Sequence, residues 1–97
     1  MTETEYTLSA TVSTDNTRAI RPVLERLFGA GSVEPGDQPG EFRIHALLEG
    51  TSARELNRAV LTELRRAEKR TRLRAEWTSR GITERFFDYV PKGSRRT

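Results

Sequence analysis

The hydrophobic residues of this chain switch between two spacings, and this switching limits the folds that the chain can adopt. In three segments, residues 6–13, 41–49 and 71–77, apolar side chains recur at every second position, and residues 82–90 form a fourth candidate strand in which Glu84 and Asp88 interrupt this pattern. A period of two predicts strands with one buried face. The segments between them do not keep this period, so the chain cannot be all strand.

Two intervening segments carry apolar residues three or four positions apart, which is the spacing of one helical face. The first predicts a helix at about residues 18–28, and Pro22 within it is expected to kink the helix or to restrict its start. The second opens with Ser52 and Glu55, the capping box in which both side chains bind the first amides of a helix. We expect this second helix to continue to about Arg70.

Glycine and proline mark the connections. Residues 29–40 hold four Gly and two Pro, which predicts a loop with a short edge strand at Ser32–Glu34. Ser79–Ile82 predicts a tight turn in which Gly81 has a positive φ. The resulting order, β-α-(β)-β-α-β-β, predicts a two-layer α+β sandwich with both helices on one face of a mainly antiparallel sheet. A ferredoxin-like (split βαβ) arrangement with an extra C-terminal strand fits this order.

The length of 97 residues suits one domain, which we place at residues 1–90, followed by a basic flexible tail at residues 91–97. The absence of cysteine excludes disulfides, zinc–thiolate sites, iron–sulfur clusters and thiol catalysis. His45 is the only histidine and lacks acidic neighbours at a metal-ligand spacing, so we expect no metal, no cofactor and no enzymatic activity. The acidic N-terminus and the lack of a run of about 18 apolar residues predict a cytoplasmic protein without a membrane partner.

Charge is distributed unevenly between the two halves of the chain. Residues 1–50 carry four Arg and eight acids, a net charge of −4, whereas residues 51–97 carry eleven Arg and two Lys against six acids, a net charge of +7. This asymmetry predicts either a polyanionic partner or association between acidic and basic surfaces. A candidate basic patch at the end of the second helix comprises Arg65, Arg66, Lys69 and Arg70.

A two-residue loop at Arg80 and Gly81 predicts which residues face each other in the last hairpin. The predicted pairs are Glu76 with Arg85, Arg74 with Phe87, and Arg72 with Tyr89. Alternation places these side chains on the sheet face that the helices leave uncovered, and places Ile82 and Phe86 under the helices. The candidate binding residues on the uncovered face are Arg43, His45, Arg72, Arg74, Arg85, Phe87 and Tyr89.

Two functions compete for this face. Tyr, Phe and Arg are typical of protein interfaces, so we expect first a small non-enzymatic interaction or self-assembling module, as a homodimer or with a protein partner. The alternative is a nucleic-acid-binding module that holds single-stranded RNA or DNA on the sheet, or duplex DNA at the basic helix end and hairpin. A third interpretation is that Phe87 and Tyr89 pack under the loop at 29–40 or under the C-terminal tail.

One segment resembles part of a known family. Residues 64–93, with LRAEW at 73–77 and RFFDY at 85–89, resemble the last helix and wing hairpin of PadR-type winged-helix regulators. The resemblance covers about 30 of the 97 residues, and upstream of it two predicted strands replace the first helices of that family. It implies duplex DNA as a partner.

Overall fold

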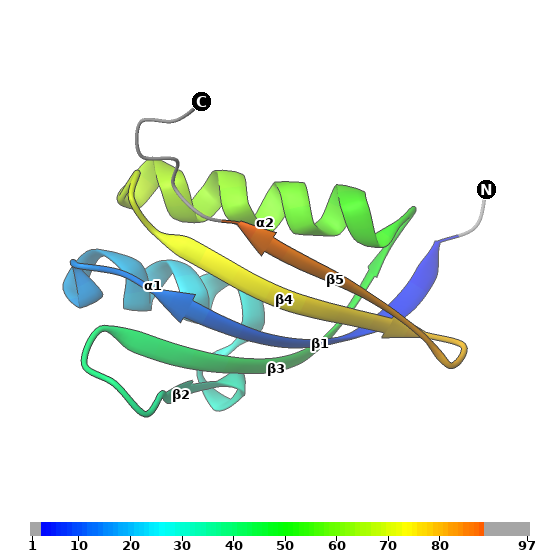
Figure 1. Ribbon diagram of the computed structural model, residues 1–97, viewed down its shortest axis with the longest axis horizontal. Helices are drawn as coiled ribbons and strands as arrows, with labels where there is room; N and C mark the ends of the chain where they lie inside the picture. The colour runs from blue at the N-terminus through cyan, green and yellow to red at the C-terminus, as the bar shows by residue number, and fades with distance from the viewer. Residues whose placement is uncertain (1–2, 89–97) are drawn as a thin grey trace.

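The computed structural model describes residues 3–88, which form a five-stranded sheet and two helices. Both helices lie against the same face of the sheet (Figure 1), so the predicted two-layer α+β fold is confirmed. The elements in chain order are β1 (Thr4–Ser13), α1 (Thr17–Phe28), the short 3-10 helix η1 (Ala30–Ser32), β2 (Val33–Pro35), β3 (Glu41–Gly50), α2 (Ala53–Ala67), β4 (Arg72–Ser79) and β5 (Ile82–Asp88).

The strand order in the sheet is β2-β3-β1-β4-β5, and every neighbouring pair is antiparallel. Helix α1 connects β1 to β2 across β3, and α2 connects β3 to β4 across β1. Two split βαβ units are therefore interleaved, and β5 extends the sheet beyond β4. This topology is consistent with the ferredoxin-like arrangement expected from the sequence.

The core lies between the sheet and the two helices. Leu8 and Val12 of β1 are buried, as the two-residue period predicts, and Ile20 and Leu24 of α1 and Leu64 of α2 cover them. The buried hydrophobic residues are Tyr6, Leu8, Ala10, Val12, Ile20, Leu24, Phe42, Ile44, Ala53, Val60, Leu64, Leu73, Ala75 and Trp77.

Trp77 of β4 is the largest fully buried side chain. Its ring meets Tyr6 edge to face, with centroids 6.4 Å apart and planes at 87°. Its Nε1 donates a hydrogen bond of 3.0 Å to Oδ1 of Asn57, a buried residue of α2. Because a buried donor without a partner is unfavourable, this bond fixes how α2 lies on β4.

Side-chain caps begin both helices. Oδ1 of Asn16 accepts a hydrogen bond of 3.2 Å from the Ala19 amide, and Oγ of Ser52 accepts one of 3.1 Å from the Glu55 amide. The second contact is half of the predicted capping box. Helix α1 includes Pro22 and is one helix over its whole length.

Helix α2 ends at Ala67, earlier than predicted. Oε1 of Glu68 accepts from the Arg70 amide at 3.2 Å, and the Thr71 amide donates to the Glu68 carbonyl at 3.1 Å. These bonds form a turn, and the buried Thr71 leads from it into β4. The prediction was too long because cations suit both a helix C-terminus and a solvated turn.

The hairpin of β4 and β5 has the predicted register. Arg80 and Gly81 have φ values of 55° and 80°, and positive φ at both positions is what a type I′ turn requires. Strand β4 also pairs with β1, so the hairpin that resembles a winged-helix wing is an integral part of the sheet. The predicted pair of Arg72 with Tyr89 includes a residue outside the described ones.

The turn end of this hairpin extends beyond the helices. Ile82 is 67% exposed, although alternation places it on the helix side of the sheet. Phe86, on the same side of β5, is half-buried against the core. The prediction that Ile82 packs under the helices was wrong, because burial there depends on how far α2 reaches along the hairpin.

Candidate interaction surface

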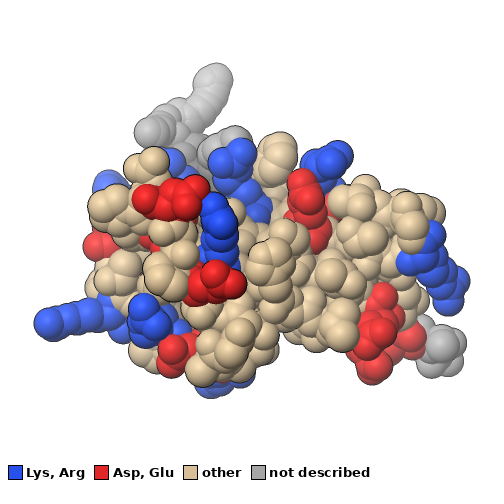
Figure 2. All heavy atoms as spheres, turned by 90° about the horizontal axis from the view of Figure 1, so that it is seen from below, with Lys and Arg blue, Asp and Glu red and all other residues tan. Residues whose placement is uncertain are grey.

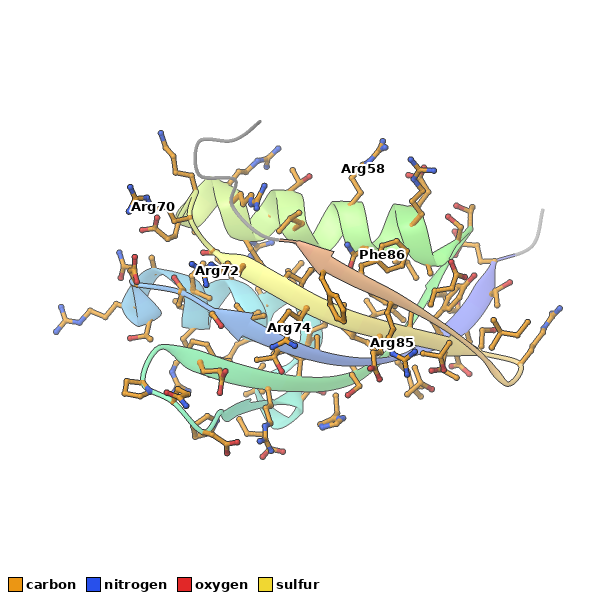
Figure 3. All side chains as sticks on the ribbon, viewed as in Figure 1. Arg58, Arg70, Arg72, Arg74, Arg85 and Phe86 are labelled. Carbon is orange, nitrogen blue, oxygen red and sulfur yellow. The ribbon has the colours of Figure 1, made fainter. Side chains whose placement is uncertain are left out.

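The sheet face away from the helices, called the open face below, has small hydroxyl side chains at its centre. Ser9 and Thr11 of β1 lie under a shallow hollow of about 270 Å³. Longer side chains of β4 and β5 surround it, and Figure 3 shows Arg72, Arg74 and Arg85 along these two strands. The hollow is lined by Ser9, Ala10, Thr11, Arg74, Glu76 and Phe87.

The strand register brings most of the predicted binding residues into two rows across the open face. The first row, from β3 to β5, is Arg43, Thr11, Arg74 and Phe87. The second row is His45, Ser9, Glu76 and Arg85. Arg72 lies opposite Ser13 at one end of the face, and Tyr89 lies outside the described residues.

Two arginines of the hairpin, Arg74 and Arg85, have cross-strand partners. The guanidinium of Arg74 lies 5.4 Å from the centroid of the Phe87 ring, and Nε of Arg85 donates to Oε2 of Glu76 at 3.0 Å. Both contacts follow from the predicted register. Each pair is exposed, so we expect each to contribute only about 0.2–1 kcal/mol to folding.

Strand β3 contributes Arg43 and His45, both exposed. Nη2 of Arg43 donates to Oδ2 of Asp37, in the loop before β3, at 2.8 Å. The loop is held in place by Glu41, whose Oε1 accepts from the amides of Asp37 and Gln38 at 3.0 and 3.3 Å. Sequence analysis missed the ion pair, because periodicity does not place a residue in an irregular loop.

The predicted basic patch is divided. Nε of Arg65 donates to the Thr71 carbonyl at 3.4 Å, and Arg66 is ion-paired within α2. Lys69 and Arg70 are exposed in the turn after α2. Two of the four cations therefore support the fold, and the other two extend the exposed positive charge that Arg72 begins on the open face.

The described part of the chain carries no net formal charge. The sequence has 17 Lys and Arg and 14 Asp and Glu; three of these cations, Lys92, Arg95 and Arg96, and none of these acids fall within 89–97. Seen from the side of β2 and β3, Figure 2 shows acidic and basic side chains interspersed around an uncharged area. A balanced domain of this kind is less typical of a polyanion-binding protein than the half-chain charges indicate.

Two exposed hydrophobic side chains stand on the open face. Leu47 of β3 is 63% exposed and Phe87 of β5 is 53% exposed. They lie in different rows, because Leu47 is opposite Thr7 whereas Phe87 is in the row of Thr11. Leu47 and Phe87 therefore occupy diagonally opposite corners of the face.

An open groove of about 770 Å³ lies between α2 and β5. Figure 3 shows Phe86 directed from β5 toward α2, and Arg58 on α2 above it. Sequence analysis missed this groove; its one signal was the spacing of four between Arg54 and Arg58, which places them on one side of the helix. The lining residues are Arg54, Asn57, Arg58, Leu61, Glu84, Phe86 and Phe87.

Within residues 3–88, no group of three or more His, Cys, Asp or Glu is placed to hold a metal ion, and no helix is long and apolar enough to cross a bilayer. No protein family model matches the chain, and no curated protein or solved structure shows significant similarity to it. The function must therefore be argued from the surface itself.

Proposed function

We propose that this protein is a small self-associating interaction module whose interface is the open face. The observation that carries the proposal is the position of Leu47 and Phe87 at diagonal corners of that face. Strands β1 and β4 lie between their strands, so the two side chains are about 14 Å apart across the sheet. Neither corner alone is large enough for a stable interface.

Two-fold symmetry joins these corners. An axis parallel to the sheet exchanges the two corners when it runs perpendicular to the line from Leu47 to Phe87 and passes over the midpoint of that line, which lies between Ser9 and Glu76. Leu47 of one copy then contacts Phe87 of the other, and the symmetry repeats this contact. An interface with apolar contacts set in a polar surface agrees with the composition of known interfaces.

Charge supports the same arrangement. The exchange brings the Phe87 corner of one copy, with Arg74 beside it, over the Leu47 corner of the other, where Glu49 is exposed. Unlike charges are therefore brought together at the rim. The net charge of the whole chain is only +3, so the general repulsion between two copies is small.

Light scattering on the purified full chain tests the proposal, with twice the monomer mass of 11.1 kDa expected. Leu47→Asp and Phe87→Asp should each give monomers, because each places a carboxylate in both apolar contacts. Ile82→Asp is the matched control, since Ile82 is equally exposed but lies off the open face. A dimer that survives both open-face substitutions, or one that Ile82→Asp abolishes, contradicts the proposal.

Nucleic-acid binding is the second candidate, and the exposed cations Lys69, Arg70 and Arg72 favour it, because none has an ion-pair partner among the described residues. Fluorescence anisotropy with single-stranded and duplex oligonucleotides should then show affinity that falls steeply between about 50 and 200 mM salt. Arg72→Ala should weaken binding and leave the mass unchanged. A monomer that binds no oligonucleotide contradicts both functions.

A further inference from the structure

Strand β5 is the last strand of the sheet, so one of its edges has no neighbouring strand among residues 3–88. In a two-residue hairpin the residues that flank the turn, here Ser79 and Ile82, form a hydrogen-bonded pair, and such pairs recur at every second position. Glu84 and Phe86 are therefore bonded to β4. The residues whose amides and carbonyls point away from β4 are Thr83, Arg85 and Phe87.

The groove between α2 and β5 runs beside this unpaired edge. Half-buried Phe86 and Leu61 and buried Asn57 line its inner part. Arg54 and Arg58 line its α2 side; both are exposed, and neither has an ion-pair partner among residues 3–88. The groove thus combines an open strand edge, two exposed arginines and an apolar part formed by Leu61, Phe86 and Phe87.

We infer that this groove binds an extended acidic peptide segment, which adds to the sheet as a strand beside β5. Strand addition satisfies the unpaired backbone groups of β5. Charge selects an acidic segment, since two arginines outweigh the one carboxylate of the lining, Glu84. Residues 89–97 hold three cations and no acid, so charge disfavours this stretch of the chain as the occupant.

The alternation of side chains along a strand defines the residue pattern that the bound peptide must have. In a strand added to β5, the residues that bond to Thr83, Arg85 and Phe87 direct their side chains to the open face, and the residues between them direct theirs into the groove. Acidic side chains at the groove positions face Arg54 and Arg58. Apolar side chains at the other positions lie beside the exposed ring of Phe87. The recognised sequence therefore alternates acidic and apolar residues.

The probe for this site is a fluorescein-labelled, terminally blocked peptide of alternating Glu and Val, titrated with the full chain by fluorescence anisotropy. The variant with both Arg54→Glu and Arg58→Glu should bind it about tenfold more weakly or worse, because attraction becomes repulsion. Glu84→Gln should tighten binding. The matched control carries Lys69→Glu and Arg70→Glu, which change the net charge equally outside the groove and should leave the affinity unchanged.

Peptide chemistry separates strand addition from simple charge attraction. N-methylation of the Val residues removes the amides that face β5 and should abolish binding, whereas N-methylation of the Glu residues should leave binding intact. A peptide with Lys in place of Glu should not bind. The monomeric variant Leu47→Asp should bind the Glu–Val peptide normally, because Leu47 lies outside the groove.

The inference is overturned if the Arg54→Glu, Arg58→Glu variant binds the Glu–Val peptide as tightly as the unmodified protein does. It is also overturned if the protein still binds the N-methyl-Val peptide or the Lys peptide. Displacement of the peptide by oligothymidylate at equal concentration would also overturn it, by showing that the arginines select phosphate. Thermal unfolding of each variant verifies that it is folded, which we expect because both arginines are exposed.

Discussion

Replacement of Asn57 by alanine tests how the core is held together, because it removes a single acceptor from a single buried donor. Nε1 of Trp77 donates to Oδ1 of Asn57 at 3.0 Å, and Trp77 has no solvent exposure. Alanine leaves the indole N–H without this partner. The variant therefore measures the cost of one unsatisfied buried group.

Two opposing effects set the size of the change. A buried donor left without a partner costs about 1–3 kcal/mol. Alanine is the better helix former within α2, and this offsets about 0.5 kcal/mol. We therefore expect the free energy of unfolding to fall by about 0.5–2.5 kcal/mol. For a domain of this size the midpoint of thermal unfolding should fall by about 3–15 °C.

Urea denaturation followed by tryptophan fluorescence measures this change directly, since Trp77 is the only tryptophan. Thr62→Ala is the control, because Thr62 is an exposed residue of the same helix and reports helix propensity alone. Trp77→Phe removes the donor. Because this substitution also removes the fluorescent residue, unfolding is then followed by circular dichroism. A double-mutant cycle of Asn57→Ala and Trp77→Phe should give a coupling energy above about 0.5 kcal/mol.

A loss below about 0.5 kcal/mol for Asn57→Ala, together with no coupling in the cycle, would refute this reasoning. Asn57 borders the groove between α2 and β5. Such a result would mean that groove water reaches the indole N–H and replaces the lost acceptor. The bond would then have no part in fixing the position of α2.

Three further substitutions test local geometry by thermal denaturation. Gly40→Ala should lower the free energy of unfolding by about 2 kcal/mol or more, because φ is 80° and a Cβ would lie 2.5 Å from the Thr14 carbonyl oxygen. A smaller loss of stability than that of Gly81→Ala would contradict this. Gly81→Ala should lower the free energy of unfolding by only about 1 kcal/mol, since φ is also 80° but no atom lies close to the added Cβ. A larger loss of stability would reveal an unrecognised contact. Ser52→Ala should cost about 1 kcal/mol through loss of the cap to the Glu55 amide, and an unchanged midpoint would show that the cap is dispensable.

The sheet was predictable because its signals are local. The two-residue period of β1 and β3 survives in the structure as alternate burial, and the residues of the hairpin turn determine the register of β4 and β5. That register then predicts the contact of Arg74 with Phe87 and of Arg85 with Glu76. Nothing beyond neighbouring strands is needed for these inferences.

Features that depend on the packing of distant elements were not predictable. The exposure of Ile82 and the groove beside β5 depend on where α2 lies on the sheet, and its contacts there, such as that of Asn57 with Trp77, join residues far apart in the sequence. The ion pair of Arg43 with Asp37 depends on a loop without periodicity. These features depend on contacts between residues that a local stretch of sequence does not reveal.

The central place of β1 has a consequence for the order in which the protein can fold. This strand is synthesised before the other four strands, yet Val12 pairs with Phe42 on one side and with Leu73 on the other. Its pairing on both sides is complete only after β4 has been synthesised. Loop closure over such separations slows folding. A chain interrupted before β4 would expose this strand to aggregation, so β4 must be synthesised before the native core can form.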